Sequence, residues 1–444
     1  MLRILIVMAV IAGCSSQTDV EVGQVPSPSQ TTSAEDNATP TDLVLAIDQL
    51  LVDLYTTEWD FESVDDVVAV GDVRAGWLLA DLMRFYQTGP AYEELIFGFS
   101  ELTGAPQDGS QVGFVWATNH LLAADVPAYE GYIEHKEAVF TPVEDRWEQF
   151  FTADVSMDWR LVTWGGVLAD ERPLDDNGPC NCIPALDHPP TTDAAGGSWY
   201  EEDRIVFGLV VGDEALALPK HQMEFHEMVN TTLDGREIGI PYCTLCGSAQ
   251  AYYLDDVAGT DRLVLRTSGL LQRSNKLMYD LTTGSAINTF TGEALTGPLA
   301  EAGVKLEQIS VVASTWGQWK TAHPDTRILA RDGGVGRVYA NDPLRGRDDD
   351  GPIFPVGPVD PRLPVQEKVI GVITADGTPV AFPVAPALAA LATGPIEYEG
   401  LTVRLADSLR VYDEDGDEVI SHESFWFGWS QFHPDTVIWD DFGS

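Results

Sequence analysis

Basic residues are scarce in this sequence. It has 25 Lys and Arg against 70 Asp and Glu, which gives a formal net charge of −45 over 444 residues. Nucleic-acid binding needs a basic face that neutralises phosphates, so we expect no nucleic-acid partner. An anionic membrane surface would repel the same charge. The excess of acidic residues indicates a heavily solvated protein surface.

Long apolar runs are absent after the first residues, so no later segment is expected to cross a membrane. Residues 1–14 differ: Arg3 precedes the apolar run Ile4–Gly13, which ends at Cys14. This length suits a signal sequence, and small residues directly before Cys14 resemble the lipobox of bacterial lipoproteins. An ordinary signal peptide is the alternative. We therefore expect lipid on Cys14 to anchor the protein to a membrane, on the extracytoplasmic face of the cell envelope.

Cysteine and histidine are also rare, with five Cys and eight His in the whole chain. His221, His226, Cys243 and Cys246 nevertheless fall within the 28 residues His221–Ser248. Ligands suited to metal or redox chemistry are therefore concentrated in one stretch.

With Cys14 assigned to lipid, Cys180 and Cys182 are the other two cysteines. A single residue separates them, and they lie in a proline-rich stretch. A Cys-x-Cys pair is poorly placed to close a relaxed internal disulfide. We expect these cysteines to be metal ligands, or halves of two separate disulfides.

Hydrophobic periodicity predicts an α+β protein, in which a helical N-terminal domain precedes a mainly β region built from two related modules. At 444 residues, two or three domains are expected. The predicted segments are a signal sequence at 1–14, a flexible linker at 15–41, the helical domain at 42–167, a Pro/Cys-rich connection at 168–203, a His/Cys-bearing module at 204–329, a connection at 330–366 and a shorter module at 367–439.

Within the first module, Ile205–Leu218 predicts a β-hairpin with a Gly-Asp turn. Residues 220–230 predict a short helix that places His226 and Asn230 four residues apart on one face. A strand over Ile238–Tyr242 then leads into Cys243.

The two modules are inferred from an internal repeat. Ile205–Pro219 matches Val369–Pro383 in pattern. The element Trp316-x-x-Trp319-x-x-x-His323-Pro-Asp-Thr326 returns as Trp426-x-x-Trp429-x-x-x-His433-Pro-Asp-Thr436. The second copy has no counterpart of His226, Cys243 or Cys246. We interpret the His-Pro-Asp-Thr units as turns and caps, and the His/Cys cluster as an added function.

Several motifs in order resemble the domain-of-unknown-function family 3179 over about residues 200–440. They are His226-Glu-Met-Val-Asn230, Tyr242-Cys-Thr-Leu-Cys-Gly-Ser-Ala249, Ser268-Gly-Leu-Leu271, Ser274-Asn275, Met278-Tyr-Asp280, Thr283-Gly-Ser285 and Trp316…His323-Pro-Asp-Thr326. The resemblance implies a shared fold but no activity. Thr244 stands where the family usually has proline, so a strained Cys-Pro turn is not essential here.

The leading hypothesis is a metal site. Cys243 and Cys246 have the spacing of a zinc knuckle, and Cys180 and Cys182, or His226, would complete four ligands. Zinc fits this set, and copper would also suit the soft ligands. In a catalytic site, Glu227 beside a metal-bound water and His226 are the candidate catalytic residues.

Two alternatives stay open. Cys243 and Cys246 also have the spacing of a thiol–disulfide redox pair, in which one thiolate attacks and the other resolves. The chain could instead be a disulfide-stapled surface protein that presents a pocket to a ligand or protein partner. Residues of this candidate pocket are His221, Asn230, Ser268 and Asn275. The sequence names no substrate and does not decide whether the protein is an enzyme.

Overall fold

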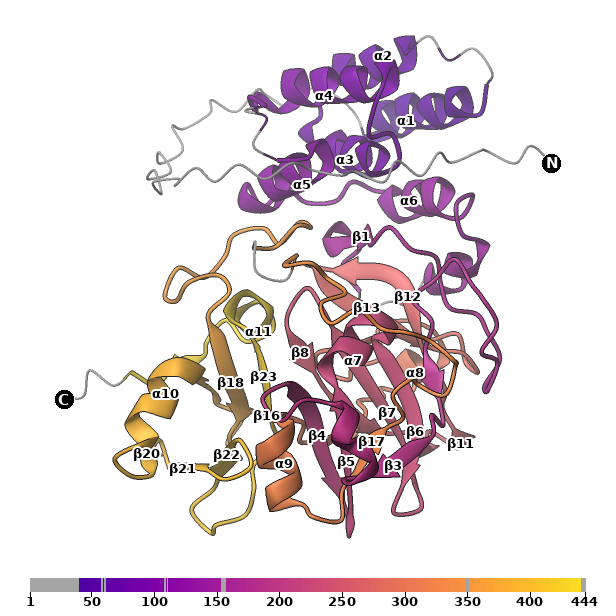
Figure 1. The fold of residues 1–444 in the computed structure, drawn as a ribbon. Coiled ribbons are helices and arrows are strands. Elements are labelled where there is room, and N and C mark those ends of the chain that lie inside the picture. The colour runs from indigo at the N-terminus through magenta and orange to yellow at the C-terminus, as the bar shows by residue number, and fades with distance from the viewer. Residues whose placement is uncertain are drawn as a thin grey trace. The chain divides into compact units, whose positions relative to one another are not determined.

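The computed structural model describes residues 40–440 except 57–58, 60, 108, 110, 153–156 and 348–350. The predicted signal sequence with Cys14, and the predicted linker up to residue 39, lie outside the described residues. The α+β class is confirmed: helices occupy the first part and short strands most of the rest (Figure 1). Within the described residues, no helix combines the length and apolarity needed to cross a bilayer.

The N-terminal region is helical because apolar residues recur every three or four positions. Leu43, Ile47 and Leu50 form the buried face of the first helix. The helix around Leu78 is buried on nearly every side and forms the centre of the region. The helices are α1 (Pro40–Leu54), α2 (Glu62–Val70), α3 (Gly76–Phe85), α4 (Pro90–Thr103), α5 (Gly113–Ala123) and α6 (Tyr132–Phe140), followed by 3₁₀ turns at Asp145–Phe150 and Trp159–Leu161.

The helical region shares its hydrophobic core with the β region. Trp147, fully buried, donates its indole N–H to the carbonyl of Ser268 at 2.7 Å. The end of the segment assigned to helices forms strand β1 (Val162–Trp164), which pairs antiparallel with β12 (Leu265–Gln272). Helices and sheets therefore belong to one compact unit.

The first module is built on a five-stranded sheet in the order β16-β4-β5-β17-β3. The predicted hairpin is confirmed as β4 and β5, which turn at Gly212. These strands and their helices are β3 (Thr191–Asp193), β4 (Ile205–Val211), β5 (Glu214–Pro219), α7 (Lys220–His226), β16 (Val312–Thr315), α9 (Trp316–Ala322) and β17 (Arg327–Leu329).

Between α7 and β16 the chain forms further sheets. One has the order β15-β9-β7-β6-β2, with β8 on β7, and another has the order β1-β12-β13-β14. The remaining pair is β10 with β11. Their bounds are β2 (Leu186–Asp187), β6 (Met228–Leu233), β7 (Arg236–Cys243), β8 (Ser248–Ala249), β9 (Ala251–Tyr253), β10 (Asp255–Val257), β11 (Thr260–Arg262), β13 (Asn275–Asp280), β14 (Ala286–Asn288), α8 (Gly297–Glu301) and β15 (Gln308–Ile309).

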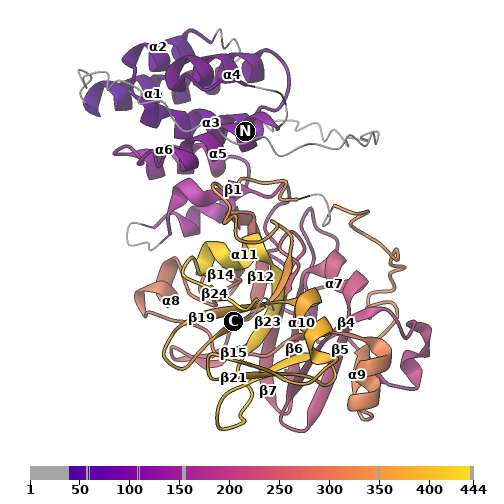
Figure 2. The same ribbon diagram turned by 90° about the vertical axis from the view of Figure 1, so that its left-hand side faces the viewer.

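The second module, drawn in orange to yellow in Figures 1 and 2, repeats the first sheet in the order β23-β18-β19-β24. The outer two pairings of this sheet keep the first module's directions: β23 is antiparallel to β18, and β24 is parallel to β19. Its elements are β18 (Lys368–Ile373), β19 (Pro379–Pro383), α10 (Val384–Leu391), β20 (Ile396–Tyr398), β21 (Leu401–Leu405), β22 (Leu409–Tyr412), β23 (Ser421–Phe425), α11 (Trp426–Phe432) and β24 (Val437–Ile438).

The predicted repeat is confirmed, with a shift of one residue in one strand. Val206 pairs with Pro219 in the first module, and Val369 pairs with Pro383 in the second. Val369 is therefore equivalent to Val206 and not to Ile205, because the turn of the second hairpin is one residue longer.

Candidate functional site

The helix before the site ends earlier than predicted. α7 stops at His226, because Glu227 adopts a left-handed conformation with φ of 53°. The next residues form β6, so Asn230 lies in a strand and does not share a helical face with His226. A left-handed backbone conformation is uncommon at a residue other than glycine. Here it ends α7 and turns the chain at Glu227 away from the helix.

Strand β7 delivers the second cysteine pair. Cys243 is its last residue, and the turn through Thr244 and Leu245 brings Cys246 back so that a disulfide joins the two cysteines. Their Cα atoms are 5.5 Å apart, in the range of ordinary disulfides. The following strand β8 pairs back onto β7.

A buried charged pair lies next to this disulfide. The ammonium of Lys276 is 3.4 Å from Oε2 of Glu227, and it donates to the backbone carbonyl of Glu227 at 2.6 Å. Thr244 donates its hydroxyl to Oε1 of Glu227 at 2.9 Å. The backbone N–H of Lys276 points at Sγ of Cys243 at 3.4 Å.

Burial lowers the pKa of Lys276 below its ordinary value, and the charge of Glu227 partly opposes that effect. Lys276 is 3% exposed and Glu227 is 8% exposed, so neither charge is screened well by solvent. Lys276 of β13 therefore contacts both Glu227 and the sulfur of Cys243.

Cys243, Lys276 and Glu227 line one cavity of about 330 Å³. Its other walls come from the strand β12, from residues near β1 and from the connection after the first module. These walls contain Gly165, Val167, Ile183, Glu224, Phe225, Thr244, Leu245, Thr267, Gly269, Leu270, Leu271, Pro343, Leu344, Arg347, Ile353 and Phe354. Cys243 is 3% exposed, whereas Cys246 is 0% exposed and is not part of the cavity wall.

Both ring nitrogens of His226 are engaged. Nδ1 is 2.7 Å from the carbonyl of Pro184, so this nitrogen carries the proton and donates it. Nε2 is 2.7 Å from the hydroxyl of Tyr339 and accepts from it. Burial lowers the pKa of His226 to about 4. His226 is therefore a neutral ring that ties the connection at 330–366 to α7.

The first cysteine pair contradicts the prediction that two cysteines at this spacing would not form a disulfide with each other. Cys180 and Cys182 form a disulfide with each other, and their Cα atoms are 5.1 Å apart. A bent loop brings neighbours at this spacing close enough, which an extended segment would not. Neither cysteine is buried, in contrast to Cys243 and Cys246.

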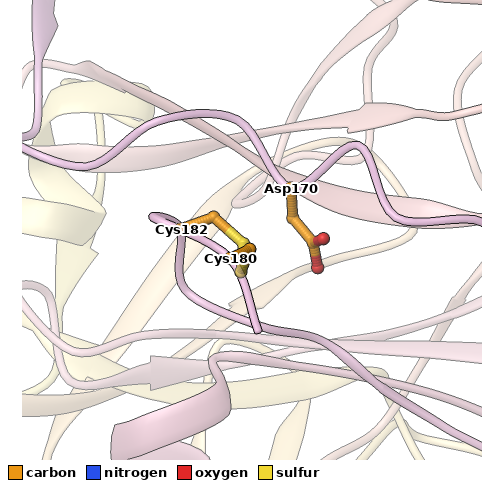
Figure 3. A group of neighbouring side chains, drawn as sticks. All are labelled: Asp170, Cys180 and Cys182. Carbon is orange, nitrogen blue, oxygen red and sulfur yellow. A yellow bond between two sulfur atoms is a disulfide. The ribbon is translucent and has the colours of Figure 1, made fainter. Parts of the chain in front are cut away.

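The carboxylate of Asp170 lies beside this exposed disulfide (Figure 3). Ligand atoms of Asp170, Cys180 and Cys182 fall within 4.8 Å of one another, and this group could hold a metal ion. Asp170 already accepts two hydrogen bonds from the guanidinium of Arg172, at 2.7 Å each, and one from the N–H of Ala185. Nothing in the group distinguishes zinc from copper.

The structure does not gather the predicted four cysteines around one point. Among the described residues, Asp170, Cys180 and Cys182 are the one group of three or more such side chains close enough to share an ion. Cys243 and Cys246 have Glu227 nearby but form no group of this kind, and His226 is occupied by Pro184 and Tyr339.

The four candidate pocket residues lie apart from the cavity at Cys243. His221 lines a separate cavity and stacks on Tyr200. Asn230 bridges Asp187 and the backbone of Leu265. The remaining two, Ser268 and Asn275, hold their own strands: Ser268 donates to the carbonyl of Leu277, and Asn275 donates to the carbonyl of Arg273.

Sequence reasoning missed Lys276 and Thr267. Lys276 stands in a strand in which all six residues are buried, in a chain with few basic residues, and that combination was the available signal. Thr267 lines the cavity from β12, and its hydroxyl has no hydrogen-bond partner among the described residues. No pattern in the sequence distinguishes it from an ordinary strand threonine.

No curated protein and no solved structure matches the chain. A family model described as "Protein of unknown function (DUF3179)" matches residues 180–399, which begins at the first cysteine of the exposed disulfide. The expected resemblance is thereby confirmed, although the match begins earlier than the motifs indicated and ends at residue 399, before the expected end near residue 440. Residues 180–399, which carry both disulfides and most of the cavity wall, therefore form a domain of the DUF3179 family of proteins of unknown function.

Proposed function

We propose that this protein carries out thiol–disulfide redox chemistry, with Cys243 and Cys246 alternating between disulfide and dithiol. One observation supports this most: Cys243 lies on the wall of a cavity beside the buried Lys276–Glu227 pair, while Cys246 lies behind it. A structural disulfide needs neither a cavity nor buried charges next to one of its sulfurs.

The two cysteines have different roles in this proposal. Cys243 is the attacking thiolate, because it faces the cavity and the N–H of Lys276 can donate to its sulfur. It attacks a sulfur of a disulfide substrate, forms a mixed disulfide and releases one thiolate. Cys246 then attacks Sγ of Cys243, closes the disulfide and releases the second thiolate, so two electrons pass to the substrate.

The proposed setting is extracytoplasmic, with the chain held at the membrane by lipid on Cys14. The support is the lipobox-like end of the apolar run and the presence of two disulfides, which persist mainly in oxidising compartments. Mass spectrometry of the mature protein tests the anchor, which requires an acylated cysteine as the first residue.

Metal binding is the second candidate, now at the exposed disulfide. Reduction of Cys180 and Cys182 would give two thiolates beside Asp170, a set within 4.8 Å that suits zinc or copper. Elemental analysis of the reduced protein tests this. One bound ion that is lost in Cys180→Ser would support the site, and the absence of metal in the reduced protein would exclude it.

The decisive experiment equilibrates the folded protein with dithiothreitol at defined potentials and alkylates it. Peptide mapping then reports Cys243 and Cys246 separately from the other cysteines. We expect the pair to be reduced while the protein stays folded, at a potential above about −300 mV. A pair that opens only when the protein unfolds would contradict the proposal and leave a disulfide-stapled binding protein as the function.

A further inference from the structure

The cavity at Cys243 limits what can reach the sulfur. Its volume of about 330 Å³ is at the lower end of the ~300–1,000 Å³ typical of small-molecule sites. Cys243 is only 3% exposed, and Leu344 and Phe354 of the connection stand in the cavity wall. The cystine of a folded partner protein could not approach Sγ of Cys243 to bonding distance. The reaction partner that enters here is therefore a small molecule.

The lining favours an apolar and uncharged molecule. Val167, Ile183, Phe225 and Leu271 are among the side chains of the wall. Two charged pairs of the wall are already matched: Lys276 with Glu227, and Glu224 with Lys220 at 2.6 Å. The other charged wall residue, Arg347, donates from Nε to the carbonyl of Leu344 at 3.2 Å. A ligand with several charges would find at most this one guanidinium as a new partner and would otherwise have to be desolvated, which is costly.

The polar atoms left over in the wall are donors. Thr267 is 3% exposed and its hydroxyl has no partner among the described residues, although buried polar groups are nearly always paired. Lys276 has three N–H groups, of which the contacts to the backbone carbonyl and the carboxylate of Glu227 use two. Both groups can donate to a carbonyl oxygen of a bound molecule.

We propose that this cavity binds a quinone, and that the Cys243–Cys246 dithiol reduces it to the hydroquinone. A quinone is an uncharged, largely apolar ring that carries two carbonyl oxygens and accepts two electrons. This inference rests on the redox function proposed above and assigns a quinone, in place of a disulfide, as the oxidant of the same site.

The reaction balances with these residues alone. The thiolate of Cys243 adds to a ring carbon, a C–S bond forms, and one carbonyl electron pair moves onto its oxygen, which takes up a proton. Cys246 then attacks Sγ of Cys243; the S–S bond forms, the C–S bond breaks, and its electrons leave the ring as hydroquinone. The two protons lost by the thiols end on the two oxygens, where Thr267 and Lys276 can stabilise the developing negative charge.

The test uses the full-length protein, reduced, freed of reductant and kept without oxygen. The probe is duroquinone, whose fully methylated ring has no free position at which a thiol could form a stable thioether. Oxidation of Cys243 and Cys246 is followed by alkylation and peptide mapping, with oxidised glutathione as the charged comparison. Each rate is divided by the rate of the same oxidant with free dithiothreitol. We expect duroquinone to be favoured at least about tenfold, the size of one retained hydrogen bond in the transition state.

Variants assign the effect to the cavity. Ile183→Trp fills the space and should remove the preference for duroquinone, whereas Ile373→Trp, at a position 41% exposed on the second module, should leave it unchanged. Thr267→Val keeps the side-chain shape and should slow duroquinone about tenfold without changing the reduction potential of the pair. In Cys246→Ser, 1,4-benzoquinone, whose ring has unsubstituted positions, should form a stable thioether on Cys243 that is visible by mass.

The outcomes separate the two proposals. If the pair cycles with dithiothreitol but duroquinone is no faster than oxidised glutathione, or if Ile183→Trp has no effect, the quinone assignment is overturned and the redox function stands. If Thr267→Val changes stability but not the duroquinone rate, a buried water satisfies that hydroxyl and the assignment also fails. If the pair does not cycle at all in the folded protein, both proposals fall.

Discussion

The two modules share a scaffold but not a site. Gly208 in β4 lies under the ring of Trp319, and Gly371 in β18 lies under the ring of Trp429. The chain between the helix after the hairpin and the last strands differs: the first module inserts β6 to β15 there, and the second inserts only the short sheet β20 to β22. The disulfide of Cys243 lies in the longer insertion, and the cavity beside it is walled by this insertion together with α7, the segment before the module and the connection after it. The frame is therefore common to both modules, and the disulfide and its cavity belong to the first module alone among the described residues.

The largest expected effect concerns the buried pair that only the first module has. Lys276→Met leaves Glu227 buried without its partner, and removing one member of a buried ion pair costs about 3–5 kcal/mol. Urea unfolding of the variant measures this loss. Glu227→Gln added to Lys276→Met removes the unpaired charge and should restore most of the stability. A single variant as stable as the wild type would show that the pair is not held in this buried arrangement.

The next effect tests whether the two frames are equivalent. A Cβ at Gly208 would lie 2.3 Å from Trp319, and a Cβ at Gly371 would lie 2.0 Å from Trp429. Each Gly→Ala variant should lose stability at the upper part of the ~1–3 kcal/mol range for overpacking, because a buried indole cannot move aside. Thermal unfolding of both variants gives the comparison. A large loss in one module alone would mean that only that module carries the fold.

The repeated histidines make different contacts and predict a pH dependence. Each histidine packs against the tryptophan of its own repeat, His323 against Trp319 and His433 against Trp429. His323 also bonds Asp407 of the second module at 2.8 Å, whereas His433 also packs against Phe290. Burial, assisted by the charge of Lys305, lowers the pKa of His433 to about 4. Between pH 6.5 and 4 the unfolded state binds a proton at this position that the folded state does not, so stability falls as the pH falls.

His433→Gln should therefore recover up to about 3 kcal/mol of the stability lost between pH 6.5 and 4. His323→Gln is the matched control and should leave that contribution in place. Urea midpoints across this pH range measure both variants. Equal pH profiles for wild type and His433→Gln would contradict the assigned burial.

Much of the frame was predictable because it follows short-range rules. Alternating apolar residues and the Gly212 turn gave the hairpin, and the repeated Trp and His-Pro-Asp-Thr residues gave the duplication. The cysteine chemistry was not predictable in the same way. Whether Cys180 pairs with Cys182 depends on a bend in an irregular loop, and Lys276 meets Glu227 only because β13 and the turn after α7 come together across 49 residues of sequence. His226 was expected at the metal, but Tyr339 from a distant connection occupies it.

The smallest expected effect concerns a tryptophan–threonine hydrogen bond that both modules contain. The indole N–H of Trp319 donates to Oγ1 of Thr326 at 2.8 Å, and that of Trp429 donates to Oγ1 of Thr436 at the same distance. Thr→Val at either position removes the acceptor but keeps the shape, so each should cost about 1 kcal/mol by leaving a buried donor unpaired. Chemical denaturation of both variants measures the costs, and costs within about 0.5 kcal/mol of each other would mean that the bond holds equivalent frames. A cost several times larger at Thr326 would instead indicate that this bond also stabilises the insertion of the first module. Only the first module contains the strands that position Cys243.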